Sequence, residues 1–233
     1  MKHAKDAILR SEQANYLEAL EPPRDELLRA LEESARERGL PISDPEVCSF
    51  LATVARSTEA RRIVELGTNI GYGAIVLARA AGPLAHVITV EKDEALAAEA
   101  RRNVAAAGLE ERIEVRAGDA VAFLESHNEP VDLAYVDCVK EDYPTYLKRL
   151  VPMLVSGGVL IADNVLWRGL VAAETVPDSE RAKVEALRTF NHDLVNHPKL
   201  RAVVLPLGDG VAFATKLGSP SMLPPAPVTL PPR

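Results

Sequence analysis

The chain has 233 residues, of which 47% are hydrophobic and 26% are charged, enough for one large globular domain with a substantial core. Its formal net charge of −7 argues against a general attraction to nucleic acid or anionic membranes, although a local basic patch is compatible with an acidic total. Two distant cysteines, a polar N-terminus and the lack of a long apolar run exclude a disulfide framework, a signal peptide and a membrane span, and they favour a reducing, cytoplasmic setting.

Residues 1–60 are expected to form a helical N-terminal cap. The Pro22-Pro23 pair breaks a first helix, because proline cannot continue the backbone hydrogen bonding of a helix. Asp44 and Pro45 then predict the N-cap and the first turn of a further helix.

From residue 61 to residue 217 the pattern changes to alternating strands and helices, which predicts the core domain. The strand segments are short, continuous and rich in valine and isoleucine, as in a sheet that is covered on both faces. They read RRIVELG, HVITVE, RIEVRAGD, VDLAYVD and GGVLIAD. Strands that alternate with helices in this way predict a doubly wound, Rossmann-like α/β fold with a mostly parallel, seven-stranded sheet.

The end of the chain predicts a change of strand direction and then a tail. The segments LRAVVLPL and GVAFATKL flank the turn residues Gly208, Asp209 and Gly210, which is typical of an antiparallel hairpin. Residues 218–233 hold six of the seventeen prolines and show no periodicity, so we expect a flexible, Pro-rich tail there.

The first strand runs into the glycine-rich segment VELGTNIGYG. Glycine lets the backbone turn tightly and approach a ligand closely. Glu91 ends the second strand, where a carboxylate is well placed to accept hydrogen bonds from a ribose diol. A tight turn without a ligand is the alternative interpretation. The further acidic residues Glu65 and Asp119 at strand ends favour a ligand site.

Two cofactor classes use such a loop. A dinucleotide site requires a third small residue and a phosphate over the helix N-terminus, but Val76 falls in that third slot and Glu65 brings a carboxylate close to the phosphates. S-adenosylmethionine carries an ammonium and a sulfonium group and has no phosphate. An acidic residue before the loop therefore favours S-adenosylmethionine.

Oxygen-bearing side chains end the fourth and fifth predicted strands. Asp137 follows VDLAYV, and Asp163 with Asn164 follows GGVLIA. A structural turn would explain Asp163-Asn164 alone. If the two strands are neighbours, however, their ends lie about 5 Å apart, and two carboxylates at that range need a cation. An all-oxygen ligand set favours Mg²⁺ or Ca²⁺ over zinc.

On these motifs the chain resembles the metal-dependent, S-adenosylmethionine-using O-methyltransferases of the catechol and caffeoyl-coenzyme A type. The resemblance covers about residues 40–217 and rests on ELGTNIGYG, TVEKD, RIEVRAGDA, VDCVKEDY, GGVLIADNVLWRG and LPLGDGVAFATK. The combination of D-x-x-K-x-x-Y with D-N-x-x-W at this spacing is its most specific part. The N-terminal segment and DNVLWRGLVA are most similar to a bacterial branch that includes enzymes methylating 5-hydroxyuridine in tRNA.

The resemblance implies a role for each matched position. Asp137, Asp163 and Asn164 match the ligands of the metal, Mg²⁺ or alternatively Ca²⁺ or Mn²⁺. Lys140 matches the general base, and Trp167 matches an aromatic residue that packs against the substrate. The positions that match the cofactor site are Ile42, Glu65, Gly67, Thr68, Gly71, Gly73, Glu91, Asp119, Ala120 and Asp137.

Two positions depart from the family pattern. Cys138 and Val139 follow Asp137 where the family often has alanine and aspartate, which puts the shape of the substrate pocket in doubt. Gly73 stands where serine is frequent. Cys138 lacks a neighbouring base to activate a thiol, so we interpret it as a packing residue.

Three functions follow from these observations. The leading one is methylation of a hydroxyl on a catechol-like small molecule, whose adjacent oxygens chelate the metal. The alternative is the same chemistry on tRNA 5-hydroxyuridine, which the branch resemblance supports and the acidic charge opposes. A cofactor-binding module without catalysis is the third, and the intact Asp137, Lys140, Asp163 and Asn164 set argues against it. Apolar faces on the N-terminal helices predict a homodimer, and no part of the chain predicts membrane association.

Overall fold

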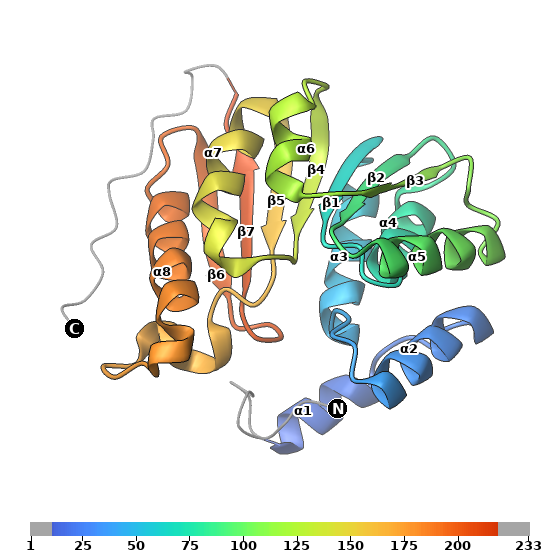
Figure 1. The fold of residues 1–233 in the computed structure, drawn as a ribbon, viewed down its shortest axis with the longest axis horizontal. Helices are drawn as coiled ribbons and strands as arrows, with labels where there is room; N and C mark the ends of the chain where they lie inside the picture. Colours follow the sequence, from blue (N-terminus) through green and yellow to red (C-terminus); the bar gives the residue numbers. More distant parts are fainter. Residues whose placement is uncertain (1–10, 219–233) are drawn as a thin grey trace. The chain divides into compact units, whose positions relative to one another are not determined.

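The structure is a computed structural model and describes residues 11–218. Its strands are β1 (Arg62–Leu66), β2 (His86–Glu91), β3 (Ile113–Ala117), β4 (Val131–Val136), β5 (Leu154–Ala162), β6 (Leu200–Leu205) and β7 (Val211–Lys216). They form a seven-stranded sheet in the order β3-β2-β1-β4-β5-β7-β6 (Figure 1). The pairs β1–β2, β2–β3 and β4–β5 are parallel, whereas β7 is antiparallel to both β5 and β6. The predicted mostly parallel sheet with a closing antiparallel hairpin is confirmed.

The chain divides into two compact units, with the boundary between Phe123 and Leu124. The N-terminal unit holds β1 to β3 with α1 (Ser11–Ala19), α2 (Glu26–Arg38), α3 (Pro45–Ser57), α4 (Tyr72–Ala81) and α5 (Glu94–Ala106). The C-terminal unit holds β4 to β7 with η1 (Lys140–Asp142), α7 (Tyr143–Met153), η2 (Trp167–Ala172), η3 (Asp178–Glu180) and α8 (Arg181–Val195). The short helix α6 (Ala120–Ser126) spans the boundary. The domain boundaries expected at residues 60 and 217 stay predictions.

Helix ends in the N-terminal unit follow from capping residues. Asp93 accepts hydrogen bonds from the backbone N–H groups of Ala95 and Leu96 and so begins α5, because these first amides have no partner inside the helix. Gly108 follows the same helix in the left-handed conformation (φ +65°), as predicted. Asp44 occupies the predicted N-cap position of α3, although its side chain makes no capping hydrogen bond.

Two elements differ from their predicted extents. β5 begins at Leu154, three residues before the predicted GGVLIAD segment. The register between β4 and β5 shifts between Val131 and Leu133, and Gly157 adopts a positive φ of +79°, so the strand continues through an irregularity that sequence periodicity does not reveal. The helix predicted at about 178–196 is a 3₁₀ turn, η3, followed by α8.

The turn of the β6–β7 hairpin packs on the segment that follows β5. Gly210 has a φ of +85°, and a Cβ atom there would lie 2.4 Å from the Leu166 Cγ atom, so no larger residue fits without movement. The backbone N–H of Val165 donates to the Gly210 carbonyl at 3.0 Å. These contacts fix the start of the loop that carries Trp167.

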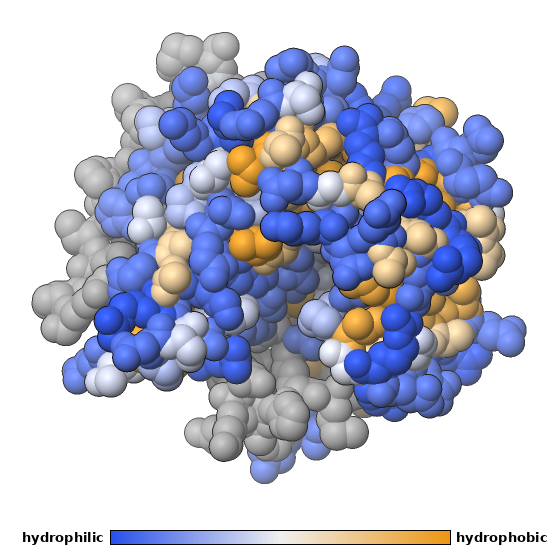
Figure 2. Space-filling view, in the orientation of Figure 1, coloured by the Kyte–Doolittle hydropathy of each residue, from blue (hydrophilic) through white to orange (hydrophobic). Residues whose placement is uncertain are grey.

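The face of the molecule in Figure 2 is mostly hydrophilic, with hydrophobic side chains in small groups. On α1 and directly after it, Tyr16, Leu17 and Leu20 are exposed by 66%, 46% and 62%. The homodimer expected from such apolar surface stays a prediction. Within residues 11–218, no helix has the length and apolar character that a membrane crossing needs. The predicted tail lies, except for Gly218, outside the described residues.

Candidate active site

A buried polar network lies where β1 leads into the glycine-rich loop of the N-terminal unit. Glu65, the fourth residue of the strand, is only 1% exposed. The Thr89 hydroxyl donates to its carboxylate, and the Thr68 and Thr89 hydroxyl oxygens lie 2.5 Å apart. A carboxylate is costly to bury unless it is hydrogen-bonded, so this network holds Glu65 in one place at the start of the loop.

The Glu91 carboxylate at the end of β2 organises the same loop. It accepts the backbone N–H of Asn69 at 2.8 Å and that of Asp93 at 2.9 Å, one on each oxygen. Gly71 adopts a φ of +89°, and a Cβ atom there would approach the Ala100 Cβ atom to 3.3 Å. The glycine is therefore required both for the backbone conformation and for close packing on α5.

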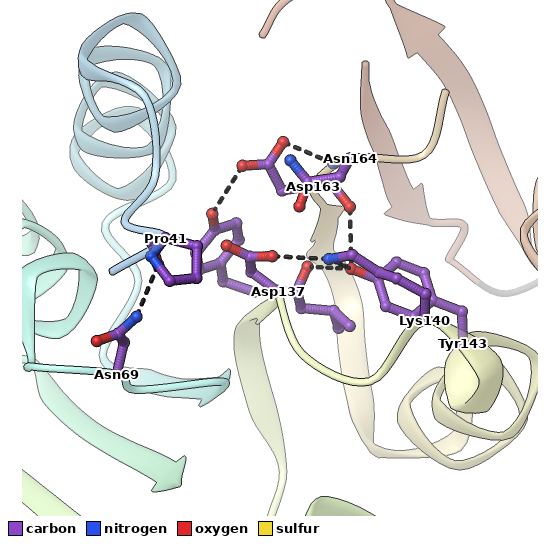
Figure 3. A network of polar contacts seen from close by, with 9 residues as sticks. Pro41, Asn69, Asp137, Lys140, Tyr143, Asp163 and Asn164 are labelled. Carbon is purple, nitrogen blue, oxygen red and sulfur yellow. Dashed lines mark hydrogen bonds and ion pairs between the residues drawn. The ribbon is translucent and has the colours of Figure 1, made fainter. Parts of the chain in front are cut away.

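Asn69 joins the glycine-rich loop to the segment before α3. Its Nδ2 atom donates to the Pro41 carbonyl at 2.7 Å (Figure 3). The bond holds the chain directly before Ile42, which is half-buried. Among the described residues, the buried Asn69 Oδ1 atom has no hydrogen-bond partner. Asn69 also has a positive φ of +48°, which asparagine tolerates better than most residues.

Asp119 lies at the adjacent strand end, between β3 and α6, and Ala120 is the first residue of α6. The Gly118 N–H donates to the Glu91 carbonyl at 2.8 Å, which ties this turn to the end of β2. Asp119 caps α6 by accepting the Val121 N–H at 2.9 Å. Four of the predicted cofactor positions, Glu65, Thr68, Glu91 and Asp119, thus follow or end adjacent strands of one unit. Gly73, predicted in the loop, is the second residue of α4.

In the C-terminal unit, Asp137 and Asp163 follow β4 and β5 directly. The two strands are parallel neighbours, with Val136 opposite Ala162, and the Asp163 N–H donates to the Val136 carbonyl at 2.9 Å. The predicted pairing of these strand ends is therefore confirmed.

Asp163 is 2% exposed, and its carboxylate is held on both oxygens. It accepts the Asn164 N–H at 2.7 Å and the Tyr135 hydroxyl at 3.3 Å. Asn164 itself is in the left-handed conformation (φ +56°).

Lys140 is a buried lysine, 7% exposed, in the turn after β4. Its Nζ atom donates to the Asp137 Oδ1 atom and to the Tyr143 hydroxyl, both at 2.8 Å. Figure 3 shows the amine between the carboxylate and the phenol. The alternative of an ordinary solvated lysine is wrong, because Lys140 is buried and its amine has two partners, whereas most lysines are exposed.

Tyr143 connects this lysine to the ends of both strands. The Tyr143 hydroxyl donates to the Asp163 carbonyl at 2.9 Å, and the Val136 carbonyl lies 3.3 Å from the same hydroxyl oxygen. Burial raises the pKa of the Tyr143 phenol well above its ordinary value. The phenol therefore stays protonated, donates to a carbonyl and accepts from Lys140.

Trp167 begins η2, three residues after Asn164, and its backbone φ is +45°. The indole N–H donates to the Glu180 carboxylate at 2.7 Å. The Lys140 Nζ atom lies 6.0 Å from the centroid of the indole ring. Asp137, Lys140, Asp163, Asn164 and Trp167 thus all belong to one compact unit.

Comparison with known proteins agrees with this arrangement. The sequence profile of one family, described as O-methyltransferase, matches residues 21–217. The chain belongs to the O-methyltransferase family. A catechol O-methyltransferase from Niastella koreensis is 32% identical over 211 residues, which cover 86% of this chain and 94% of that protein.

Solved structures agree with the family as well. The O-methyltransferase from Bacillus cereus in complex with SAH is 30% identical, with a TM-score of 0.79 and coverage of 88% of this chain and 97% of that one. The O-methyltransferase TomG from Streptomyces achromogenes in complex with SAM is 29% identical, with a TM-score of 0.79 and coverage of 90% and 100%.

The geometry of this family member adds residues to which sequence reasoning gave no role. Tyr143 belongs to the D-x-x-K-x-x-Y motif, three residues after Lys140. Its hydrogen bond to the Asp163 carbonyl, twenty residues later, could not be read from that motif. Thr89 and Glu180 gave no signal, because their partners are distant in the sequence. For Cys138, burial raises the pKa of the thiol to about 12, which keeps it protonated and supports its interpretation as a packing residue.

Proposed function

We propose that this O-methyltransferase uses S-adenosylmethionine and a divalent cation to methylate a hydroxyl of a catechol-like small molecule. The observation that carries the proposal is the buried Lys140 amine, held between Asp137 and Tyr143 beside the Asp163-Asn164 strand end. The complexes of the Bacillus cereus and Streptomyces achromogenes relatives with SAH and SAM support the cofactor.

The N-terminal unit supplies the residues proposed to bind the cofactor. Glu91 is fixed by two backbone N–H groups, and each of its oxygens retains capacity to accept a ribose hydroxyl. The buried Glu65 carboxylate favours a cationic ligand, such as the ammonium and sulfonium of S-adenosylmethionine, over a dinucleotide phosphate. Asp119 and Ala120 are proposed to lie at the adenine, and Gly67, Gly71, Thr68 and Ile42 along the rest of the molecule.

The C-terminal unit supplies oxygen ligands that fit a hard divalent cation. Two carboxylates and one amide follow adjacent strands, and Mg²⁺ is commonly bound through one or two carboxylates with waters completing the shell. Within residues 11–218, no three histidine, cysteine or acidic side chains gather as a metal site, and the proposed set has two carboxylates, Asp137 and Asp163, and the amide of Asn164. When bound, such a cation lowers the pKa of a ligated hydroxyl and fixes its direction.

Lys140 is proposed to remove the proton from the acceptor hydroxyl. Methyl transfer is an in-line displacement, so the protein must align the oxygen and leave its lone pair available. Tyr143 positions the amine because its phenol accepts from Nζ while it donates to the Asp163 carbonyl. Trp167 is proposed to pack against the flat acceptor, with its indole held by Glu180.

Replacing Glu91 with alanine should weaken S-adenosylmethionine binding about 10-fold to 100-fold, because hydrogen bonds to a charged group are lost. Calorimetry measures the affinity directly. A cofactor analogue lacking the ribose hydroxyls should lose less affinity in the variant than S-adenosylmethionine does, because the lost support of the loop affects both ligands and the lost ribose hydrogen bonds affect only the natural cofactor. Glu114→Gln on the neighbouring strand is the control, since Glu114 is exposed and pairs with Arg116. Unchanged S-adenosylmethionine affinity in the Glu91 variant would remove the ribose assignment.

The acceptor class is tested by offering the two kinds of substrate in separate reactions. The enzyme is incubated with labelled S-adenosylmethionine and Mg²⁺, in one reaction with a panel of catechols and in another with unmethylated bacterial tRNA. We expect label in a catechol product. Label in tRNA alone would replace the small-molecule acceptor by the tRNA alternative.

A further inference from the structure

Residues 39–44 connect α2 to α3 in the N-terminal unit and contain Ile42, which is proposed to lie along the cofactor. The segment begins at Gly39, which ends α2 in the left-handed conformation (φ +66°), and it contains neither a helix nor a strand. Pro41 is exposed, and because proline has no backbone N–H, its carbonyl is its only hydrogen-bonding group. A donor from elsewhere in the unit is therefore needed to hold Pro41 in place.

The two ends of this segment are anchored by the helices on either side. Before it, the Arg38 guanidinium pairs with the Glu99 carboxylate of α5 at 2.6 Å and 3.0 Å. After it, α3 buries Val47 and Leu51 completely. Residues 39–44 can therefore move away from the glycine-rich loop without the unfolding of α2 or α3.

The Asn69 side chain ties the middle of this segment to the glycine-rich loop. Its Nδ2 atom donates to the Pro41 carbonyl at 2.7 Å (Figure 3). The orientation of the amide follows from this partner, because the opposite orientation would place two acceptor oxygens against each other. Within residues 11–218, the buried Oδ1 atom is left without a hydrogen-bond partner, which is costly. The bond to Pro41 is thus the interaction that fixes this side chain.

The backbone of Asn69 is held independently of its side chain. Its N–H donates to the Glu91 Oε2 atom at 2.8 Å, and the carbonyl of the next residue, Ile70, accepts from the Asn103 Nδ2 atom at 2.8 Å. All of these residues belong to the unit formed by residues 12–123. Asn69 therefore joins a fixed loop, which includes the contact to the proposed ribose acceptor, to a segment that can move.

We propose that Asn69 is a positioning residue, which holds residues 39–44 closed against bound S-adenosylmethionine and so slows the release of the cofactor. This inference rests on the proposed cofactor site. When the bond from Nδ2 to Pro41 breaks, Ile42 moves with the segment and the cofactor is free to leave. The contacts proposed for Glu91 do not depend on this bond. The effect should therefore fall on the dissociation rate of the cofactor more than on its association rate.

The test compares two variants that lose the donor in different ways. Asn69→Gly removes the side chain, and glycine accepts the φ of +48° without strain. Asn69→Asp keeps the size but places an oxygen against the Pro41 carbonyl. Each variant should release labelled S-adenosylmethionine about threefold to tenfold faster into excess unlabelled cofactor, the usual effect of one lost hydrogen bond, with the association rate within about twofold of wild type.

Release of S-adenosylhomocysteine is measured in the same way. Its sulfur carries no positive charge, so the carboxylate of Asn69→Asp cannot offset the lost bond by attracting a sulfonium. In the complex with S-adenosylhomocysteine, amide hydrogen exchange within residues 39–44 should be faster in both variants than in wild type, because local opening exposes these amides.

Asn103→Asp is the matched control. It removes a hydrogen bond from an asparagine Nδ2 atom to the same loop, at Ile70, and leaves the bond from Asn69 to Pro41 in place. Its cofactor release and its exchange within residues 39–44 should stay within about twofold of wild type. Thermal melting of all three variants checks that they are folded.

The outcomes separate this inference from the proposed function. Unchanged release in Asn69→Gly, or an equal increase in Asn103→Asp, overturns the role of Asn69 and leaves the cofactor site standing. Faster release with unchanged exchange within residues 39–44 would mean that Asn69 contacts the cofactor directly, and it would also overturn the positioning role. If the wild-type enzyme binds neither S-adenosylmethionine nor S-adenosylhomocysteine, the proposed function itself fails.

Discussion

Replacing Lys140 by methionine should lower the rate of methyl transfer by about 10²–10⁴-fold, the usual contribution of a positioned general base. Methionine has a similar length and apolar stem, so it fills the buried position without accepting a proton. Affinity for S-adenosylmethionine, measured by calorimetry, should change little, because Lys140 is not among the proposed cofactor ligands. The loss should shrink on a nitro-substituted catechol, whose hydroxyl ionises more readily.

Lys148→Met is the matched control for this variant. Lys148 lies on α7, eight residues further along the chain, and is exposed. Its replacement should leave turnover unchanged. Near-native turnover of Lys140→Met on an unactivated catechol would mean that another group removes the proton, and Lys140 would then have only a structural role.

Asp163→Asn should reduce methyl transfer by more than about 100-fold and remove detectable Mg²⁺ binding. Residues that only support a metal ligand typically contribute 10–100-fold, and a ligand should exceed that range. Asparagine keeps the size and one acceptor oxygen, so the hydrogen bonds from Asn164 and Tyr135 need not both be lost. Activity should not return when Mg²⁺ is raised.

The control for Asp163→Asn is Asp193→Asn on α8. Asp193 is exposed and contacts His192, away from the strand ends. Both variants are compared by calorimetry with Mg²⁺ and by thermal melting. Retention of Mg²⁺ affinity in the Asp163 variant, with a stable fold, would exclude Asp163 from the metal site.

Much of the C-terminal half of the site follows from sequence pattern and sheet geometry. Parallel neighbouring strands bring their carboxyl ends to one edge, so Asp137 and Asp163 were expected near each other once β4 and β5 were recognised as adjacent. The spacing of three residues between Asp137 and Lys140 lets a single turn return the amine to the carboxylate. Each strand end and the Asp137–Lys140 spacing is a feature of one short segment, so the sequence pattern reveals it.

Contacts between distant segments were not predictable from the sequence. The Tyr143 hydroxyl bonds the Asp163 carbonyl twenty residues later, and the Asn69 amide bonds Pro41. The left-handed backbone at Trp167 and Arg168 has no local signal, because both residues ordinarily avoid that region. Asp209, forty-one residues away, accepts the Arg168 N–H in this conformation.

The extent of β5 was missed for a related reason. A register shift against β4 and a positive φ at Gly157 allow the strand to begin at Leu154. Glycine and serine disfavour a strand interior, and the predicted strand began at Gly157 and left Leu154, Val155 and Ser156 outside it. Pairing with β4 overrode that local preference.

A divalent cation at the Asp137, Asp163 and Asn164 oxygens is proposed to be required for methyl transfer to a catechol. The most direct measurement follows labelled methyl transfer from S-adenosylmethionine to a catechol by the wild-type enzyme in excess chelator, and then after Mg²⁺ is restored. We expect no transfer in chelator and full recovery with Mg²⁺. Full transfer in excess chelator would contradict the metal-dependent mechanism.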